Sequence, residues 1–574
     1  MSPLAAGPRG AARWIVPVYA LGLTVAVTGP LLAPGYLLLR DAVSTPRSYL
    51  SDSALGLGDT APRAVPQDFA VASLSAAVDG GVIVTALLFA ALFLAGWGAA
   101  RLAAQVVGEA GLAGQFIATT LAVWNPYVAE RLLQGHWSLL LGYGCLPWVA
   151  TAVVRLRDGT ATAAGWAGLV APMALAGLTP TGMILAAAVG LTCVAAPGTG
   201  VRRPRCTAAI AVIFVLAASP WLLASGLGGT LGRPQSAGLS PFAARAEPGL
   251  GTLGSLAGLG GLWNAEAVPA SRTTYFAIVG TAVLLAVVVA GAGSLRRKPA
   301  ALPLLVLAAV GVLLPAAMAT GPGLAALRAV VDVTPGLAVL RDGQKWVALA
   351  MPGYALAGAA SVLTVRRRIP PAAWAAVCCL ALIAVLPDLA WGVGGKVRPV
   401  RYPPGWAEVA ARINSDPRTV GVLPADTMRQ FGWAGPAPVL DPLPRWVRAD
   451  VLFTGDLLIG GTTVAGEGTH AREIQRLLLS GADPAALRRA GVGWVVVETG
   501  TPGDTGSAAA TLRPLKPAYR DGDLTLYRVG GTSAGARPAV RVAVLAAHLV
   551  WAALLLGAAA VLVVQSFRRP WRRS

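Results

Sequence analysis

Leu37-Leu38-Leu39-Arg40-Asp41-Ala42-Val43-Ser44-Thr45-Pro46-Arg47-Ser48-Tyr49 is the stretch of sequence that decides the expected fold. We interpret its first residues as the end of a hydrophobic helix, which passes directly into a polar loop that begins with an acid. A hydrophobic run of this kind followed by a charged loop indicates a boundary between membrane and water. We expect any chemistry of the protein at that boundary.

The composition of the whole chain indicates a membrane protein. Its 574 residues are 55% hydrophobic and only 13% charged, and the mean hydropathy is +0.65. One soluble core could not bury so much apolar surface, so we expect an integral membrane protein. The net charge of +20 does not indicate nucleic-acid binding, because the basic residues stand in short clusters between apolar runs, where the positive-inside rule explains them.

The basic clusters predict about twelve transmembrane helices with both termini in the cytoplasm. Arg9 and Arg13 precede the first span, about Trp14 to Leu39, and therefore place the loop of Asp41 outside. That apolar run is too long for a signal-peptide core, so we expect it to be retained. Every later basic cluster falls on the inner side once the spans alternate. The other spans are expected at about 80–100, 112–124 and 137–154, as two around the turn 178–182, at 207–227, before 296, at 302–320, before 366, at 372–391 and at 540–564.

The segment 392–537 is more charged than the rest and predicts a small extracytoplasmic α/β domain. Short β-like runs stand at Val420–Leu423 and Trp494–Val497, and amphipathic helix patterns at His470–Ser480 and Pro484–Ala490. The chain is thus expected to divide into three parts. These are a membrane domain, 1–391, with about eleven spans and large outer loops at 40–79, 228–274 and 321–345; the α/β domain, 392–537; and a final span with a basic cytoplasmic tail, 538–574.

Asp41 is the first candidate for chemistry. An acid at the outer end of a span can meet a substrate whose lipid tail stays in the bilayer while its head group reacts. The alternative is a solvated loop acid beside Arg40, an interfacial arginine. Asp52 is the nearest other acid in the loop.

Two further charged clusters lie at expected outer turns. Glu130 and Arg131 interrupt an apolar environment and are expected to line a cavity or to pair, because a charge facing hydrocarbon costs roughly 2.5 to 3.5 kcal/mol. His136 follows them as a candidate donor or base, although a lone histidine is more often an ordinary hydrogen-bonding residue. In the other cluster, Arg341 and Lys345 flank Asp342. Two cations there suit a phosphate or pyrophosphate, or else anchor a helix at the interface.

No cofactor is indicated with certainty. The five cysteines lie within or beside apolar segments without metal-ligand spacing, so we expect neither a zinc site nor a disulfide framework. A requirement for a divalent metal is left open. The sequence contains no Gly-x-x-x-x-Gly-Lys-Ser/Thr motif, which argues against an ATP-driven pump.

A first span, an outer loop opening with Asp41, further large outer loops, many spans and a late extracytoplasmic domain together resemble the C-type superfamily of polytopic membrane glycosyltransferases. The run Asn125-Pro126-Tyr127-Val128-Ala129-Glu130-Arg131-Leu132 and the Ala/Gly/Arg/Val-rich composition are similar to actinobacterial envelope proteins. The resemblance implies transfer of a sugar from a polyprenyl-phosphate donor to a cell-envelope glycan or lipid acceptor, outside the cytoplasmic membrane. One feature departs from it: the Asp-x-Asp or Glu-Asp pair often found in the first loop is absent, which leaves a single-acid site or an inactive member.

Under this resemblance Asp41 would act as general base, and Arg341, Lys345 or Arg131 would stabilise the departing phosphate. Arg40, Asp52, Glu130, His136 and Asp342 complete the expected substrate-binding residues. A carboxylate paired with Arg40 would be a poorer base. The competing class is a non-catalytic transporter or scaffold for envelope polysaccharide or lipid assembly. Convergence of Asp41, Glu130 and Arg341 on one cavity would favour the enzyme.

Overall fold

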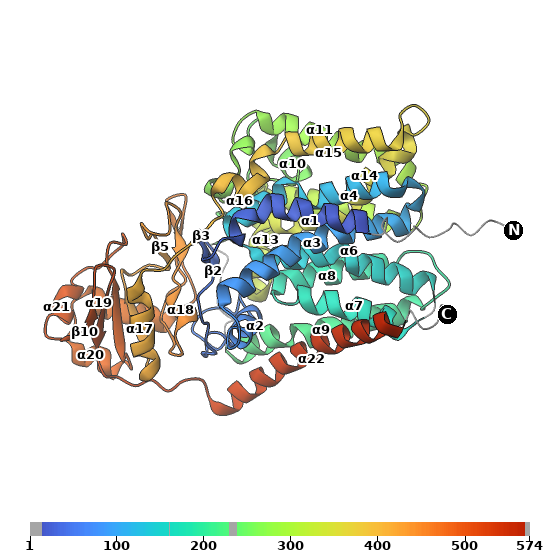
Figure 1. Cartoon of the computed structure of the whole chain (residues 1–574). Coiled ribbons are helices and arrows are strands. Elements are labelled where there is room, and N and C mark those ends of the chain that lie inside the picture. Colours follow the sequence, from blue (N-terminus) through green and yellow to red (C-terminus); the bar gives the residue numbers. More distant parts are fainter. Residues whose placement is uncertain (1–13, 160, 229–237, 569–574) are drawn as a thin grey trace.

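A long bundle of helices meets a smaller domain of strands and helices at one of its ends (Figure 1). The computed structural model describes residues 14–159, 161–228 and 238–568. Helix α1 (Ile15–Thr28) begins and helix α22 (Pro538–Arg568) ends at the far end of the bundle, away from the smaller domain. The described parts of the chain therefore start and finish on the same side.

The bundle is that of a multi-pass membrane protein. In the described residues, seven helices are long and apolar enough to span a membrane, or up to nine if each of two bent pairs is one span. Each of the twelve predicted segments contains a helix. Four of these, α4 (Gly111–Val123), α7 (Ala163–Ala176), α8 (Pro180–Cys193) and α15 (Pro371–Ala384), have only 13 or 14 residues, whereas about 20 are needed to cross a bilayer. The number twelve therefore stays a prediction. The seven long spans are Ile15–Leu32, α3 (Gly80–Val106), α6 (Trp137–Asp158), α9 (Arg203–Leu227), α11 (Phe276–Leu295), Gly343–Val365 (η9, Gly343–Ala350, with α14, Met351–Val365) and α22.

The first span ends earlier than the sequence suggests, so the predicted helix through Leu39 is wrong. Helix α1 closes with a short 3-10 turn, η2 (Gly29–Leu32), and Tyr36–Leu39 form strand β1. Gly35, with φ at +147°, adopts a backbone conformation that favours glycine and turns the chain out of the helix. The three leucines are buried in this strand and not in a membrane helix: Leu37 and Leu39 pack into the core of the bundle, and Leu38 packs into a core of the smaller domain.

Two other predicted boundaries differ in the structure, and both lie where a helix bends sharply. The region 321–345, expected as a loop, contains helix α13 (Gly321–Val333) and the 3-10 helix η8 (Pro335–Leu340). The hydroxyl of Thr320 caps α13 by accepting from the Gly323 amide at 3.2 Å. This helix bends by 92° from α12 (Leu302–Met318). The span expected to reach Trp391 ends earlier, at Ala384, where helix α15 (Pro371–Ala384) stops. The helical segment that follows, Pro387–Gly395, is bent by 74° from α15.

The smaller domain is built around a four-stranded sheet of order β10-β11-β9-β4. Strand β4 is parallel to β9, and the other neighbours are antiparallel. Alternate side chains of each strand face opposite sides: Val422 and Val496 pack with one cluster that includes Trp406, and Leu423 and Val495 with another. Helix α17 covers the first side and α19 to α21 the second. The elements are β4 (Val420–Leu423), β9 (Trp494–Glu498), β10 (Pro517–Arg520), β11 (Leu524–Arg528), α17 (Pro404–Ser415), α19 (Thr469–Leu479), α20 (Pro484–Arg489) and α21 (Ala508–Leu512).

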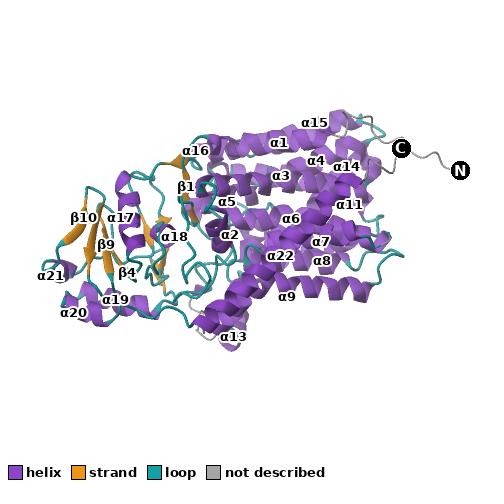
Figure 2. Ribbon diagram, turned by 60° about the horizontal axis from the view of Figure 1, so that its bottom comes forward, coloured by secondary structure: helices purple, strands orange, loops and turns teal. Residues whose placement is uncertain are grey.

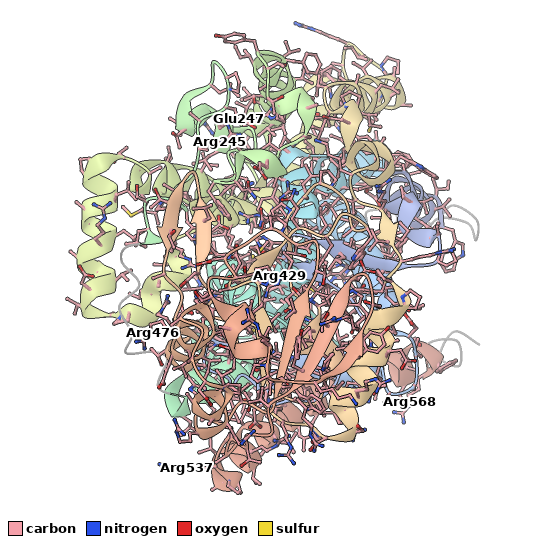
Figure 3. All side chains as sticks on the ribbon, turned by 90° about the vertical axis from the view of Figure 1, so that its left-hand side faces the viewer. Arg245, Glu247, Arg429, Arg476, Arg537 and Arg568 are labelled. Atoms are coloured by element: carbon pink, nitrogen blue, oxygen red, sulfur yellow. The ribbon has the colours of Figure 1, made fainter. Side chains whose placement is uncertain are left out.

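The strands and helices predicted inside 392–537 are thereby confirmed, and their connection to the loop of Asp41 (40–79) is new. Strand β1 lies between β2 (Ala42–Val43) and β3 (Pro399–Val400) in a small sheet at the junction of bundle and domain (Figure 2). Arg40 adds a bridge to Val439 of strand β6 (Val439–Leu440). Viewed from the domain end, Arg429 on the short strand β5 (Met428–Arg429), the partner of β6, lies near the centre of the molecule (Figure 3). The loop that carries Asp41 is therefore held by both parts of the protein.

Candidate functional site

Asp41 lies in the tight turn between β1 and β2, against the end of helix α5 (Pro126–Gln134). Its amide donates to the Gln134 carbonyl at 3.1 Å. Gly135 ends α5 with φ at +83°, and a Cβ there would overlap the Leu39 carbonyl and the Ala42 amide. Glycine is required at this position both for the left-handed backbone and for the close approach of the end of α5 to the turn of Asp41.

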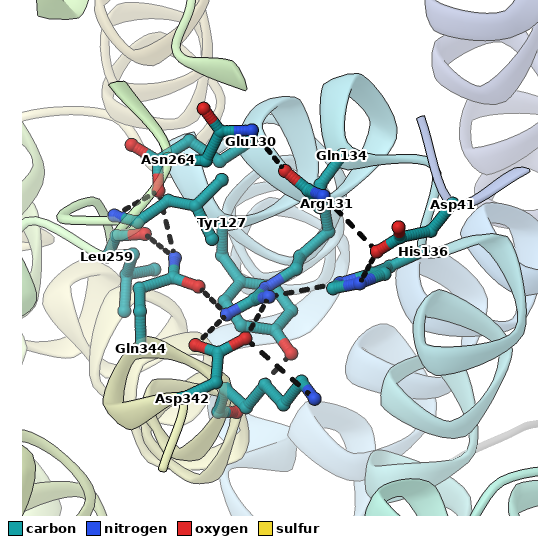
Figure 4. Close-up of polar contacts among 12 residues, drawn as sticks. Asp41, Tyr127, Glu130, Arg131, Gln134, His136, Leu259, Asn264, Asp342 and Gln344 are labelled. Atoms are coloured by element: carbon teal, nitrogen blue, oxygen red, sulfur yellow. Dashed lines mark hydrogen bonds and ion pairs between the residues drawn. The ribbon is translucent and has the colours of Figure 1, made fainter. Parts of the chain in front are cut away.

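A chain of polar side chains begins at Asp41 and runs into the protein (Figure 4). His136 Nε2 lies 2.8 Å from Asp41 Oδ2, and Gln134 Nε2 donates to the same oxygen at 3.2 Å. His136 Nδ1 lies 3.0 Å from Arg131 Nη1. The Arg131 guanidinium forms a bidentate pair with Asp342, at 2.8 and 3.0 Å. Five residues from three separate segments thus form one continuous network.

The network continues to a second buried carboxylate. Arg131 also donates to the Gln344 side-chain oxygen, and Gln344 Nε2 donates to Glu130 Oε2 at 3.0 Å. The Leu262 amide donates to the same oxygen of Glu130 at 3.1 Å. Burial and the nearby charge of Glu247 raise the pKa of Glu130 above its ordinary value. Glu130 is fully buried and holds Gln344 in place at the end of the network that lies away from Asp41.

The environment separates the charge states of Asp41 and His136. Burial would raise the pKa of Asp41, but the hydrogen bond and the charge of His136, together with Gln134 and Lys345, hold it below its usual value. Burial lowers the pKa of His136, against the opposing effect of Asp41. At neutral pH the pair is therefore a carboxylate and a neutral imidazole. Burial likewise opposes the ionised form of Asp342, yet Arg131 and Lys345 hold its pKa well below the usual range.

Asp41 borders a cavity of about 990 Å³ at the junction of the bundle and the α/β domain. Its side chain is 36% exposed. Both parts of the protein contribute to the walls, and so do the ends of helices α6, α8 and α9. The lining residues used below are Arg40, Asp41, Arg63, His136, Leu139, Ile184, Trp221, Phe242, Arg341, Asp342 and Lys345.

Two cations in this wall are available to an anion. The Arg341 guanidinium stacks 4.2 Å above the Phe242 ring. Burial and the nearby charge of Arg63 lower its pKa to about 10, so it remains a cation at neutral pH. The Lys345 ammonium contacts Asp342 at 3.8 Å, a loose pair that leaves donors free. A partly buried group of like charges that neighbouring acids do not fully balance is suited to binding an anion.

The structure brings together six of the nine predicted site residues. Arg40, Asp41, His136, Arg341, Asp342 and Lys345 line the cavity, whereas Asp52, Glu130 and Arg131 are not among its lining residues.

The Arg131 side chain is fully buried in its pair with Asp342 and does not reach the cavity where a ligand would bind. Asp52 pairs with Arg541 at 2.6 Å and accepts from the Ala536 amide at 2.7 Å. These contacts join the loop 40–79 to the start of α22 and to the segment before it. The expected convergence of Glu130 on the cavity is therefore wrong, while that of Asp41 and Arg341 is confirmed.

Arg40 does not weaken Asp41 by pairing with it. Among the described residues, its guanidinium donates to the carbonyls of Leu133 at 2.7 Å and Glu266 at 2.9 Å. These two bonds join the loop of Asp41 to α5 and to the region 228–274. The backbone of Arg40 has φ at +48°, an uncommon conformation for a residue with a side chain, and it orients the following Asp41.

Sequence reasoning missed Gln134 and Gln344, which are central to the network. Gln134 stands three residues after Arg131, so the helical period places both on one side of α5. Gln344 has no such local signal, because its side-chain partners Arg131 and Glu130 lie more than two hundred residues earlier. Within the described ranges, no group of three or more His, Cys, Asp or Glu side chains could hold a metal ion.

No family model and no curated protein matches this chain. Among solved structures, it is similar to the crystal structure of ArnT from Cupriavidus metallidurans in the apo state. The two share 12% sequence identity, with 91% of this chain and 100% of that chain covered, at a TM-score of 0.43. The function proposed below therefore rests on the geometry of the site.

Proposed function

We propose that this protein transfers a sugar from a polyprenyl-phosphate donor to a cell-envelope glycan or lipid acceptor at the outer face of the cytoplasmic membrane. The observation that carries the proposal is one cavity that presents both the Asp41 carboxylate and the cations Arg341 and Lys345. A base for the acceptor and a counter-charge for a phosphate leaving group are the two groups that such a transfer needs.

The cavity also suits a donor that remains partly in the bilayer. Leu139, Ile184 and Trp221, at the ends of helices α6, α8 and α9, form an apolar part of its wall. A prenyl chain could stay among these helices while its phosphate reaches Arg341 and Lys345. The sugar would then lie between the cations and Asp41.

In the proposed reaction, an acceptor hydroxyl attacks the anomeric carbon and the bond from that carbon to the phosphate oxygen breaks. The hydroxyl proton passes to Asp41, and the electron pair of the broken bond leaves with the polyprenyl phosphate. Arg341 and Lys345 stabilise the charge that develops on this phosphate. Because the pKa of Asp41 is low, the carboxylate is ionised at neutral pH and takes the proton late, when the new bond is largely formed.

The test is a glycosyl-transfer assay with membranes that contain the wild type, Asp41→Asn or Asp79→Asn. Asp79 is the matched control, because it lies in the same outer loop outside the cavity lining and caps α3 by accepting from the Gly81 amide at 2.8 Å. Asparagine preserves such a cap. We expect Asp41→Asn to lower the transfer rate by about 10² to 10⁴-fold, the usual contribution of a general base, and Asp79→Asn to leave it unchanged.

Equal transfer by the wild type and Asp41→Asn would refute the catalytic role of Asp41. If wild-type membranes transfer no sugar from any polyprenyl donor but bind such a donor, the protein would instead belong to the class of transporters or scaffolds.

A further inference from the structure

We infer that Arg131 is a positioning residue that fixes the tautomer of His136 and thereby selects the oxygen of Asp41 that is left for the acceptor. The role of Asp41 as base rests on the proposed function, but the tautomer of His136 follows from the geometry alone. Arg131 itself does not line the cavity, so its effect reaches the site through the imidazole.

A guanidinium has only N–H donors and no acceptor, and it is always charged in proteins. His136 Nδ1, which lies 3.0 Å from Arg131 Nη1, must therefore accept this hydrogen bond and carry no proton. The proton of the neutral ring is then on Nε2, which donates to Asp41 Oδ2 at 2.8 Å.

The position of Arg131 is itself strongly determined. Its side chain is fully buried and is held by the bidentate pair with Asp342. The oxygen of Gln344 accepts from Arg131, so the amide nitrogen faces Glu130 and donates to it at 3.0 Å. The orientation of Gln344 is thereby fixed by its partners on both sides. A rigidly held donor imposes one tautomer on His136.

This arrangement determines how Asp41 is used. His136 and Gln134 both donate to Oδ2, and among the described residues Oδ1 has no hydrogen-bond donor, so Oδ1 is the oxygen that remains for an acceptor hydroxyl. Arg131 also opposes protonation of His136, because a second cation so close to the ring is repelled. Without Arg131, His136 could become an imidazolium paired with Asp41, and such a pair would make Asp41 a weaker base.

The groups that face His136 come from several segments, and they define its pH dependence. Asp41 favours the protonated ring, whereas Arg131 and Lys345 disfavour it. Asp342 is close enough that the charge of His136 affects it. Removing only Arg131 would leave Asp342 buried without its main partner, so an informative variant must change both residues.

The direct test is the ¹⁵N spectrum of the full-length protein in lipid nanodiscs, labelled at histidine. The chain has only three histidines, His136, His470 and His548, and His136→Gln identifies the signals of His136. His548 is an internal reference, because its Nδ1 lies 2.8 Å from the Val544 carbonyl. A carbonyl only accepts, so the proton of a neutral His548 is on Nδ1. We expect His136 and His548 to show opposite tautomers at pH 7, and a proton on Nδ1 of His136 would overturn the inference.

The variant test compares a double variant, which carries both Arg131→Met and Asp342→Asn, with the single variant Asp342→Asn. The two proteins differ only at Arg131, and an unchanged His548 signal shows that each is folded. We expect His136 in the double variant to lose its fixed tautomer. Its ring should then become protonated as the pH falls towards about 6.5, the ordinary pKa of a histidine. Identical His136 spectra in the two variants at pH 6 and pH 8 would overturn the inference.

The activity readout is the pH profile. Between pH 8 and pH 6, we expect transfer by the double variant to fall at least about fivefold, and by Asp342→Asn less than about twofold, because only the former protonates His136. Parallel profiles of the two variants would contradict the positioning role. If the spectra are as expected but the wild type transfers no sugar, the proposed function fails and the assignment of the tautomer stands.

Discussion

Replacing Gly135 by alanine should displace the carboxylate of Asp41 without changing any polar side chain of the site, although Gly135 itself lines the cavity. Gly135 has φ +83° and ψ +17°, and an alanine in this left-handed conformation costs roughly 1–2 kcal/mol. The added Cβ would also overlap the Leu39 carbonyl and the Ala42 amide. Both are backbone atoms of the β1–β2 turn and cannot swing aside as a flexible side chain could.

The magnitude follows from the overlap. Non-bonded atoms pack at about 3.5–4.0 Å, and an added Cβ would approach the Leu39 and Ala42 backbone far more closely, so the turn must shift by on the order of 1 Å. A misplacement of about 1 Å can cost about 10²-fold in rate. We therefore expect Gly135→Ala to destabilise the protein by more than the conformational cost and to lower sugar transfer about 100-fold.

Gly394→Ala is the matched control for the backbone term. Gly394 has a similar conformation, φ +64° and ψ +34°, but the nearest atom to an added Cβ is the Asp388 carbonyl at 3.9 Å, an ordinary contact. We expect this variant to lose roughly 1–2 kcal/mol of stability and to keep its activity.

The assays are the thermal unfolding of both variants in detergent, the transfer rate, and the ¹⁵N signals of His136. The hydrogen bond of His136 to Asp41 should weaken only in Gly135→Ala. If Gly135→Ala matches Gly394→Ala in all three measurements, the close packing of α5 against the Asp41 turn does not position the site, and the reasoning is refuted.

Two other predictions concern the cavity and the α/β domain. Arg341→Gln should lower kcat/KM for a polyprenyl-phosphate sugar at least about tenfold, because a hydrogen bond to a charged group contributes about 1.5–3 kcal/mol, and an unchanged kcat/KM would exclude Arg341 from phosphate binding. Burial and the charge of Asp441 raise the pKa of Glu498 above its ordinary value, although Arg429 opposes this. The native state therefore holds a proton that the unfolded state releases above about pH 4.5, so the stability of the domain should fall as the pH rises from 5 to 8. Hydrogen exchange of the β9 amides measures this, and Glu498→Gln should reduce the dependence, because burial also raises the pKa of Asp441, which remains. A stability that rises with pH in this window would contradict the assignment.

The sequence predicts the class of the protein and much of its local structure. Apolar composition and clustered basic residues are sufficient for a multi-pass helical protein, because the free energy of burying a helix in lipid is nearly a sum over its own residues. Strands β4 and β9 and helices α19 and α20 were likewise predictable, since alternation and helical periodicity are local signals. The charged clusters around Asp41 and Arg341 were recognised for the same reason, as charges at the ends of apolar runs.

The roles within the site could not be predicted in this way. Leu37 to Leu39 have the composition of a helix end, but they form a strand. Leu38 and Leu39 pair with β2 directly after them, and Leu37 pairs with β3, more than three hundred residues later in the chain. Arg131 resembled a ligand for phosphate, but its partner Asp342 is 211 residues away and neutralises it inside the protein. Glu130 faces Gln344 and Leu262, again from distant segments.

By itself the sequence therefore determined where the chain is apolar, where it is charged and where Asp41 stands relative to the first hydrophobic run. Only the tertiary structure decided which charges cancel in buried pairs, which remain in the cavity, and which nitrogen of His136 faces Asp41. The physical reason is that hydrophobicity accumulates residue by residue along the chain, whereas a hydrogen bond requires two groups within about 3 Å, and their meeting depends on the folding of everything between them.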